Sequence, residues 1–451
     1  MLKDVLALAG AAAMVLALPQ APALAADKPA AAPIPGPRTC FWFRGPHNAD
    51  PYINVAYPDQ GAFYWSAVVT IPQGATLRLK GQFPHARYMS FVSYRATGQA
   101  VESLADTAIA ADPGSANPFI AGSNRAAAKR NYTVTVALRP DSKEAGDGKV
   151  TGGDGTNTLR APLVETGKGA VSILYRIYAN DLAQPVTGGV PLPTAELTMA
   201  DGSVLKGEAA CAALNSRQPW TADVTSLGVP VPMYQTAKNQ PGKPATWPAQ
   251  PGVEWHVQHP RPAALSVFTG NHEGQTGRGG GEFYPNPDNR YARGYVSTKF
   301  GPVLVLRGRM PTTPRTIHGD KSMGTGQLRY WSLCSNVVMI NSRVENCLFD
   351  EQVPIDSARN YIIVASKEKD RPRNARVECG VAWLKLPDDG DSVGDPDFSL
   401  LVIRNMLAAA DFPEALQNAL DDKDLTKLGP YLPGGQYMFR NTFESVVPCP
   451  L

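Results

Sequence analysis

Four of the six histidines fall in one window of the sequence, and carboxylates lie close to them. The histidines are His256, His259, His272 and His318, and the neighbouring acids are Glu254, Glu273 and Asp320. Imidazole and carboxylate groups together suit zinc, copper or iron. The spacing of His256 and His259 differs from the His-Glu-x-x-His helix of zincins, and the surrounding prolines disfavour a helix. The four histidines are therefore a candidate site for a divalent metal ion, with structural histidines as the alternative.

Carboxylates provide a second candidate for chemistry, because acidic pairs occur at two matched places. The pairs are Asp106 with Asp112 and Asp350 with Glu351. Paired carboxylates catalyse glycoside hydrolysis when they face each other across a cleft. Strand alternation would turn the adjacent Asp350 and Glu351 to opposite faces, so ion pairing with Arg125 or Arg359 is the simpler expectation. The candidates for acid/base catalysis are His318, Asp320 and Asp350.

A glycine-rich stretch, residues 269–291, ends in aromatic and cationic side chains. It does not match the Gly-x-Gly-x-x-Gly phosphate loop, which needs a preceding strand and a following helix. Its last residues would suit a groove for a sugar ring or an apolar ligand. The candidate ligand-binding residues are therefore Phe283, Tyr284, Arg290 and Tyr291. The alternative is a loop that packs against the rest of the fold.

The elements that position these residues occur twice. "RYMSFVSY" (87–94) matches "RYWSLCSN" (329–336), and "GATLRLKGQFP" (74–84) matches "GPVLVLRGRMP" (301–311). Downstream, "KRNYTVTVAL" (129–138) matches "ARNYIIVASK" (358–367), and the acidic blocks lie between. Four matched blocks in the same order predict an internal duplication.

The matched blocks alternate apolar and polar residues with a period of two, which is typical of strands. With 41 glycines and 41 prolines, the chain is predicted to be mostly β, with short strands and many loops. We expect tandem antiparallel β-sandwich or jelly-roll halves at residues 26–227 and 263–451, joined by a proline-rich connector at 228–262. Helical spacing after residue 395 predicts C-terminal helices in the second half.

Residues 1–25 have the pattern of a secretory signal peptide: Lys3, an apolar core, and Ala23-Leu24-Ala25 as a cleavage site. The predicted location is therefore periplasmic or extracellular, without a transmembrane anchor. The formal net charge of +3 is near neutral for this length and argues against a nucleic-acid partner.

Six cysteines remain after this segment, and an even number in an oxidising compartment predicts three disulfides. Six cysteines allow fifteen pairings. Grouping along the sequence favours Cys40 with Cys211, Cys334 with Cys347, and Cys379 with Cys449.

Two stretches, "SILYRIYAND…GGVPLP" (172–193) and "RYWSLCSN" (329–336), resemble uncharacterised exported β-rich proteins of bacterial envelopes. The resemblance covers short parts of each half and implies no activity or functional residue.

These observations support two hypotheses for function. In the first, the protein is exported and binds a small-molecule, carbohydrate or protein ligand without chemistry. In the second, it is an extracytoplasmic hydrolase or lyase, metal-assisted or acid/base, with its cleft between the halves. Convergence of the histidines, or a subset of them with Asp320, in one pocket would favour the enzyme.

Overall fold

A computed structural model describes residues 33–95, 98–139, 156–162, 170–218, 228–258, 265–271 and 284–449 of the chain. The predicted signal peptide lies outside the described residues, as do His259, His272 and Phe283. The described residues from position 35 onward belong to one structural unit. Among the residues described, no helix has both the length and the apolar character needed to cross a bilayer.

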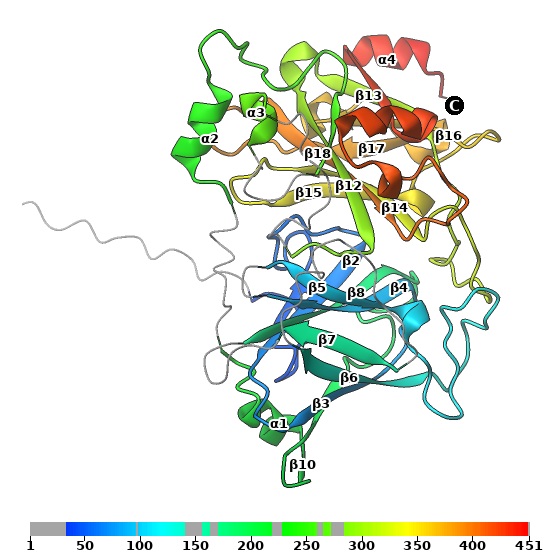
Figure 1. Cartoon of the computed structure of the whole chain (residues 1–451). Helices are drawn as coiled ribbons and strands as arrows, with labels where there is room; N and C mark the ends of the chain where they lie inside the picture. The colour runs from blue at the N-terminus through cyan, green and yellow to red at the C-terminus, as the bar shows by residue number, and fades with distance from the viewer. Residues whose placement is uncertain are drawn as a thin grey trace, which may run out of the picture. The chain divides into compact units, whose positions relative to one another are not determined.

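The first half contains two five-stranded sheets (Figure 1). The first has the order β1-β2-β8-β4-β5, formed by Arg44–His47, Ala62–Val69, Val171–Asn180, Ala86–Tyr94 and Ala100–Ala105. The second has the order β10-β9-β3-β6-β7, formed by Val204–Lys206, Thr194–Thr198, Thr76–Gln82, Asn131–Arg139 and Thr158–Pro162. Aromatic and β-branched residues favour these strands, and alternation turns every second side chain inward. Leu79, Phe91 and Tyr175 meet in the core that both sheets share.

The second half contains a five-stranded and a four-stranded sheet. The first has the order β11-β12-β18-β14-β15, formed by Trp255–Val257, Asn289–Ser297, Phe398–Met406, Tyr330–Asn336 and Val344–Phe349. The second has the order β17-β16-β13-β19, formed by Val381–Lys385, Asn360–Ser366, Val303–Arg309 and Gly434–Met438. Trp331, Leu306 and Ile363 belong to the core between them.

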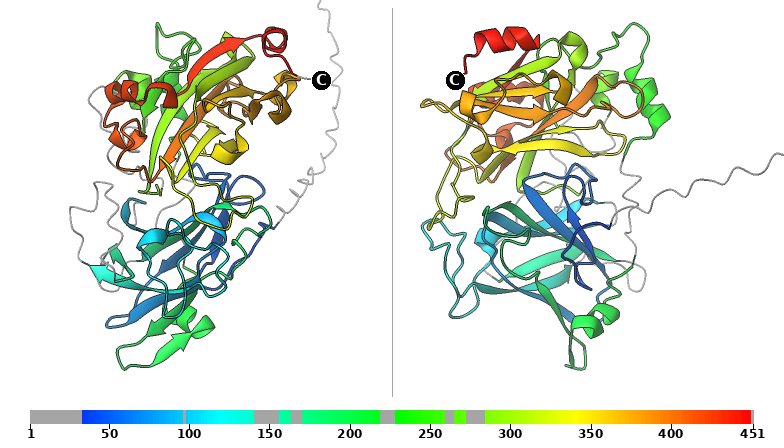
Figure 2. Two further views of the ribbon diagram at one scale, coloured as in Figure 1. Left: turned by 90° about the vertical axis from the view of Figure 1, so that its right-hand side faces the viewer. Right: turned by 180° about the vertical axis from the view of Figure 1, so that it is seen from behind.

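The strand orders of the two halves correspond. β1-β2-β8-β4-β5 matches β11-β12-β18-β14-β15, and β9-β3-β6-β7 matches β19-β13-β16-β17. In both halves the same edge pair is parallel: β6 with β7, and β16 with β17. The prediction of a mostly β fold with two similar halves is therefore confirmed, and Figure 2 shows the four sheets from two further directions.

The segment at residues 398–406 corrects one prediction. Its spacing predicts a helix, but it forms β18, the middle strand of its sheet, with all nine residues buried. A strand buried on both faces has a continuous apolar run, which periodicity alone does not distinguish from a helix. After β18 the described chain has short 3₁₀ segments, the strand β19 and one α-helix, α4 (Arg440–Val446). Phe443 of α4 packs against Val305 and Val364 of the β17-β16-β13-β19 sheet.

The matched blocks 74–84 and 301–311 both contain a glycine after a basic residue, and this repeated glycine has a steric cause. Gly81 lies opposite Tyr132 in the β3–β6 register, and Gly308 lies opposite Tyr361 in the β13–β16 register. A Cβ atom would lie 2.5 Å from the Tyr132 hydroxyl oxygen at Gly81 and 2.6 Å from the Tyr361 hydroxyl oxygen at Gly308. Each tyrosine therefore occupies the space that a side chain would need.

The strands that carry the repeated Arg-Tyr pair are buried on both faces. All nine residues of β4 and all seven of β14 are buried. One face contributes to the core of its own half. The other belongs to an aromatic cluster shared by both halves, in which Tyr178 meets Tyr330 with ring centroids 5.3 Å apart. The two halves therefore contact each other through the faces of their β4- and β14-containing sheets.

The proline-rich segment 228–262 contains regular structure. Helix α2 (Val231–Lys238) begins with proline in its first turn, where the missing N–H costs nothing. Further along, β11 pairs with β12 and so belongs to the sheet of the second half. Domain boundaries at 227 and 262 remain a prediction.

Three disulfides join Cys40 to Cys211, Cys334 to Cys347, and Cys379 to Cys449, which are the pairs predicted from sequence grouping. The first joins the segment before β1 to α1 (Gly207–Ala213) across 171 positions. The second joins directly opposed residues of β14 and β15. The third ties the end of the described chain to the turn before β17.

Candidate functional site

Ion pairs cross between the halves at equivalent positions. Nη1 of Arg87, in β4, lies 2.6 Å from Oδ1 of Asp350, and Arg87 also donates to Glu351. In the equivalent arrangement, Nη2 of Arg329 lies 3.6 Å from Oδ1 of Asp106. Each arginine therefore reaches the aspartate of the other half, as an approximate twofold axis requires.

The tyrosines of the repeated Arg-Tyr pair also cross. The Tyr88 hydroxyl donates to Asp288 of the second half, and the Tyr330 hydroxyl donates to Asp59 of the first half over 3.0 Å. Ser332 Oγ donates to the other oxygen of Asp59 over 2.6 Å. The repeated motif thus holds the two halves together through buried, hydrogen-bonded polar groups.

Asp350 and Glu351 correct the sequence-based expectation for the acidic pairs. They lie in a 3₁₀ turn, Asp350–Gln352, so strand alternation does not separate them, and both side chains bind the same guanidinium. Their partner is Arg87 rather than Arg125 or Arg359. Asp350 also accepts the backbone N–H of Trp331 over 3.0 Å. Among the contacts described, Asp350 therefore has a structural role in joining the halves.

The buried Asp106 carboxyl should make stability depend on pH. Burial, partly offset by Arg329, raises its pKa to about 6, against about 3.9 for an unfolded chain. A carboxyl with a raised folded-state pKa disfavours folding when ionised, so its folded state gains stability as pH falls. We expect the wild type to gain about 1 kcal/mol relative to Asp106→Asn between pH 7 and pH 5. Urea unfolding of both proteins at these pH values tests this, and a constant difference would contradict it.

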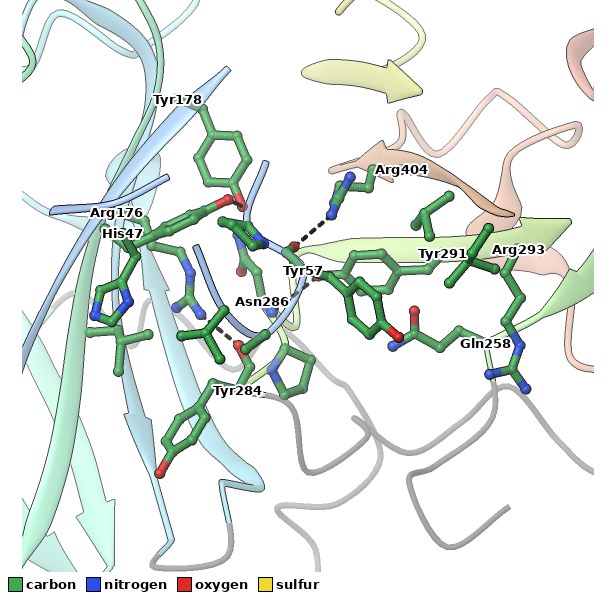
Figure 3. A pocket seen from close by; sticks show the side chains of 18 of the residues that line it. His47, Tyr57, Arg176, Tyr178, Gln258, Tyr284, Asn286, Tyr291, Arg293 and Arg404 are labelled. Carbon is green, nitrogen blue, oxygen red and sulfur yellow. Dashed lines mark hydrogen bonds between the residues drawn. The ribbon is translucent and has the colours of Figure 1, made fainter. Parts of the chain in front are cut away.

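A cavity of about 90 Å³ lies where the two halves meet (Figure 3). It is several times larger than the 10–15 Å³ that one buried water needs. Its lining combines five tyrosines, aliphatic side chains and three arginines; the tyrosines are Tyr57, Tyr64, Tyr178, Tyr284 and Tyr291. Each half contributes the two strands that occupy corresponding positions in its sheet: β2 and β8 in the first half, and β12 and β18 in the second.

The lining follows the duplication. Tyr64 pairs with Arg176 across β2 and β8, and Tyr291 pairs with Arg404 across β12 and β18. Upstream of each tyrosine the chain reads Tyr-Pro, at Tyr57 and at Tyr284, and both residues have positive φ, 51° and 54°. The cavity is therefore built from matched elements around the contact between the halves.

The cavity carries positive charge. Its three arginines are Arg176, Arg293 and Arg404, and none of the described residues that line it is acidic. Asp59, just outside the lining, lies 3.7 Å from Nη1 of Arg404, whose Nη2 donates to the backbone oxygen of Tyr57 over 2.8 Å. Of the three arginines, Arg404 therefore has a nearby carboxylate.

Arg176 and Arg293 keep unused hydrogen-bond donors. Their side chains belong to residues 3% and 6% exposed, and Nη1 of Arg176 and both Nε and Nη2 of Arg293 have no hydrogen-bond partner among the described residues. Nη2 of Arg176 donates to the Tyr284 backbone oxygen over 2.8 Å, and Nη1 of Arg293 lies 3.9 Å from the Met339 sulfur. A buried charged donor without a partner destabilises the protein unless a ligand or a water molecule accepts its hydrogen bond.

Burial favours the neutral form of the cavity's histidine and of two of its tyrosines. Burial, together with Arg176 and two further arginines, lowers the pKa of His47 to about 3. Burial raises the pKa of Tyr178 and of Tyr284 to about 12. The cavity therefore offers neutral hydrogen-bonding groups around a positively charged, largely apolar space, which suits an anion with an organic body.

Two of the four predicted ligand-binding residues, Tyr284 and Tyr291, line this cavity. Arg290 lies on β12 but is not part of the lining; Nη1 lies 3.3 Å from the backbone oxygen of Asn289. Phe283 lies outside the described residues. Ligand binding by any of the four remains a prediction.

The described histidines of the candidate metal site have other surroundings. His256 is buried on β11, and its Nδ1 lies 2.7 Å from Oδ2 of Asp422. His318 and Asp320 are exposed on a loop that contacts the first half, where the backbone oxygen of Asp320 accepts from Arg125 over 2.8 Å. The described part of the chain brings one potential metal-ligand trio together, Asp59 with Cys334 and Cys347. Both of these sulfurs are in a disulfide and are not thiolate ligands.

Sequence reasoning missed the three arginines of the cavity. The signal was present in two further matched blocks, "YPDQGAFY" (57–64) with "YPNPDNRY" (284–291), and "SILYRIYAN" (172–180) with "LLVIRNMLA" (400–408). The first pair of blocks keeps two tyrosines at the same spacing, and the second pair keeps one arginine at the same position, while most other residues differ. Arg293 has no counterpart of its own type, since the first half has Ser66 at the matching position.

No family model matches the chain, and no curated protein matches it. It is similar to a solved structure of an uncharacterised protein from Burkholderia cenocepacia, with 11% identity, a TM-score of 0.44, and coverage of 86% of this chain and 79% of that one. A solved structure from Vibrio parahaemolyticus has 10% identity, a TM-score of 0.36, and coverage of 79% and 86%. Neither description names an activity.

Proposed function

We propose that this protein binds a small organic anion in the cavity between its two halves. The observation that carries the proposal is that two buried arginines of the cavity, Arg176 and Arg293, have donors without partners among the described residues. A carboxylate accepts two such hydrogen bonds in the plane of one guanidinium. The aliphatic and tyrosine side chains around them suit the apolar body of the ligand.

The proposal places this binding outside the cytoplasm, in the periplasm or beyond the cell. Support comes from the signal-peptide pattern of residues 1–25 and from three disulfides, which persist in oxidising compartments. A hydrolase or lyase that uses the candidate histidines has no comparable support among the described residues, because His256 is engaged with Asp422 and His318 is exposed.

Calorimetric titration with hexanoate tests the proposal. We expect Arg293→Gln to weaken hexanoate binding about 10- to 100-fold, because a hydrogen bond to a charged group contributes about 1.5–3 kcal/mol. Arg309→Gln is the control, since Arg309 is an exposed arginine on β13 and lies outside the cavity lining. It should bind hexanoate as the wild type does.

Circular dichroism and thermal unfolding would first establish that both variants are folded. Equal binding by the wild type and a folded Arg293→Gln protein would contradict the proposal. So would the absence of wild-type binding to millimolar hexanoate and to mono- and dicarboxylates of four to eight carbons.

A further inference from the structure

The two arginines with unused donors come from different halves. Arg176 lies on β8 of the first half, where its guanidinium carbon lies 5.4 Å from the ring centre of Tyr64 and 5.5 Å from that of Tyr94. Arg293 lies on β12 of the second half, beside Met339. Each arginine therefore projects from a strand of its own half, and Arg176 also contacts the second half through the backbone oxygen of Tyr284.

The two guanidinium groups lie on opposite sides of Tyr57. Figure 3 shows Arg176 beside His47 and Arg293 beside Gln258, with Tyr57 and Tyr291 between them. The remaining arginine, Arg404, already has Asp59 as its carboxylate. The cavity therefore has two separate cationic positions that lack a counter-ion among the described residues that line it.

Much of the remaining cavity lining is apolar. Its lining includes the side chains of Val55, Leu174, Met339, Leu400 and Val402. A ligand with one anionic group would compensate one arginine and leave the other without a counter-ion among the described lining residues, which is unfavourable. A ligand with an anionic group at each end would compensate both.

We infer that the cavity binds a dianion whose two acidic groups are separated by an apolar spacer, one group at Arg176 and the other at Arg293. This inference rests on the proposed function and adds the number and placement of the ligand's charges. Each acidic group of the ligand would be an oxyanion, either planar like a carboxylate or tetrahedral like a phosphate. Dicarboxylates are the simplest probes of this class.

The test compares dicarboxylates with monocarboxylates of equal length: succinate with butanoate, adipate with hexanoate, and suberate with octanoate. We expect the dicarboxylate to bind about 10- to 100-fold more tightly at the chain length that spans both arginines. Monomethyl adipate or monomethyl suberate, which keeps the length and removes one charge, should lose that advantage.

The protein side of the test uses Arg176→Gln and Arg293→Gln separately. In a folded variant, either substitution should reduce the dicarboxylate's affinity to about that of the monocarboxylate. The half-esters keep the test decisive if Arg176→Gln does not fold. Equal affinity of mono- and dicarboxylates at every length, with hexanoate still dependent on Arg293, would overturn the inference and leave the proposed function standing. No binding by any acid of the series would overturn both.

Discussion

Replacing Arg87 with Met is expected to destabilise the protein by about 3–5 kcal/mol. The substitution leaves Asp350, which is 5% exposed, without the guanidinium that lies 2.6 Å from both of its oxygens. An unpaired buried carboxylate is far more costly than a buried ion pair is favourable. Equilibrium unfolding in urea measures the loss.

The double variant Arg87→Met/Asp350→Asn separates this penalty from simple loss of packing. Removing the buried charge together with its partner should restore about 1–3 kcal/mol relative to the sum of the single variants. Arg329→Met is the matched control at the equivalent position, where the ion pair with Asp106 is longer and the Arg329 side chain is 13% exposed. It should cost less than Arg87→Met. Loss of less than about 1 kcal/mol in Arg87→Met would contradict the account of how the halves are joined.

Removing the disulfide between Cys40 and Cys211 is expected to cost about 3–5 kcal/mol of stability. This bond closes the longest loop of the three disulfides, with a sequence separation of 171. Because the entropy that a crosslink removes from the unfolded chain grows with loop length, this bond should stabilise the fold most. It also holds the segment before β1, in which Trp42 is fully buried against Phe91 and Tyr175. Unfolding of Cys40→Ala/Cys211→Ala in urea tests the prediction.

Cys379→Ala/Cys449→Ala provides the comparison. That disulfide has a separation of 70 and ties the end of the described chain next to α4. Because α4 is a short terminal element, its end can open locally without unfolding the sheets. We therefore expect a smaller loss of global stability. A larger effect from this pair than from Cys40 and Cys211 would contradict the prediction.

The sequence predicts the duplication because each repeated residue makes an equivalent contact in both halves. Gly81 and Gly308 are repeated because a tyrosine of the neighbouring strand fills the space above each. Arg87 and Arg329 are repeated because each reaches an aspartate of the other half. Neither cause is local, so the pattern predicted two similar halves but not the contacts between them.

The limits of sequence reasoning follow from the same physics. β18 was predicted as a helix because a strand buried on both faces loses the alternation that marks a strand. The cavity was missed because its residues, such as Tyr57 and Arg404, come from segments far apart in the sequence. Its most distinctive residue, Arg293, departs from the repeat, and only the fold places it beside the matched residues.

The measurement that tests the central claim most directly is a crystal structure of the protein soaked with 6-bromohexanoate, with anomalous data collected at the bromine edge. We expect one bromine peak in the cavity between the halves, with the carboxylate bound by Arg293. A bromine peak elsewhere, or an empty cavity at a concentration of acid that saturates binding in solution, would contradict it.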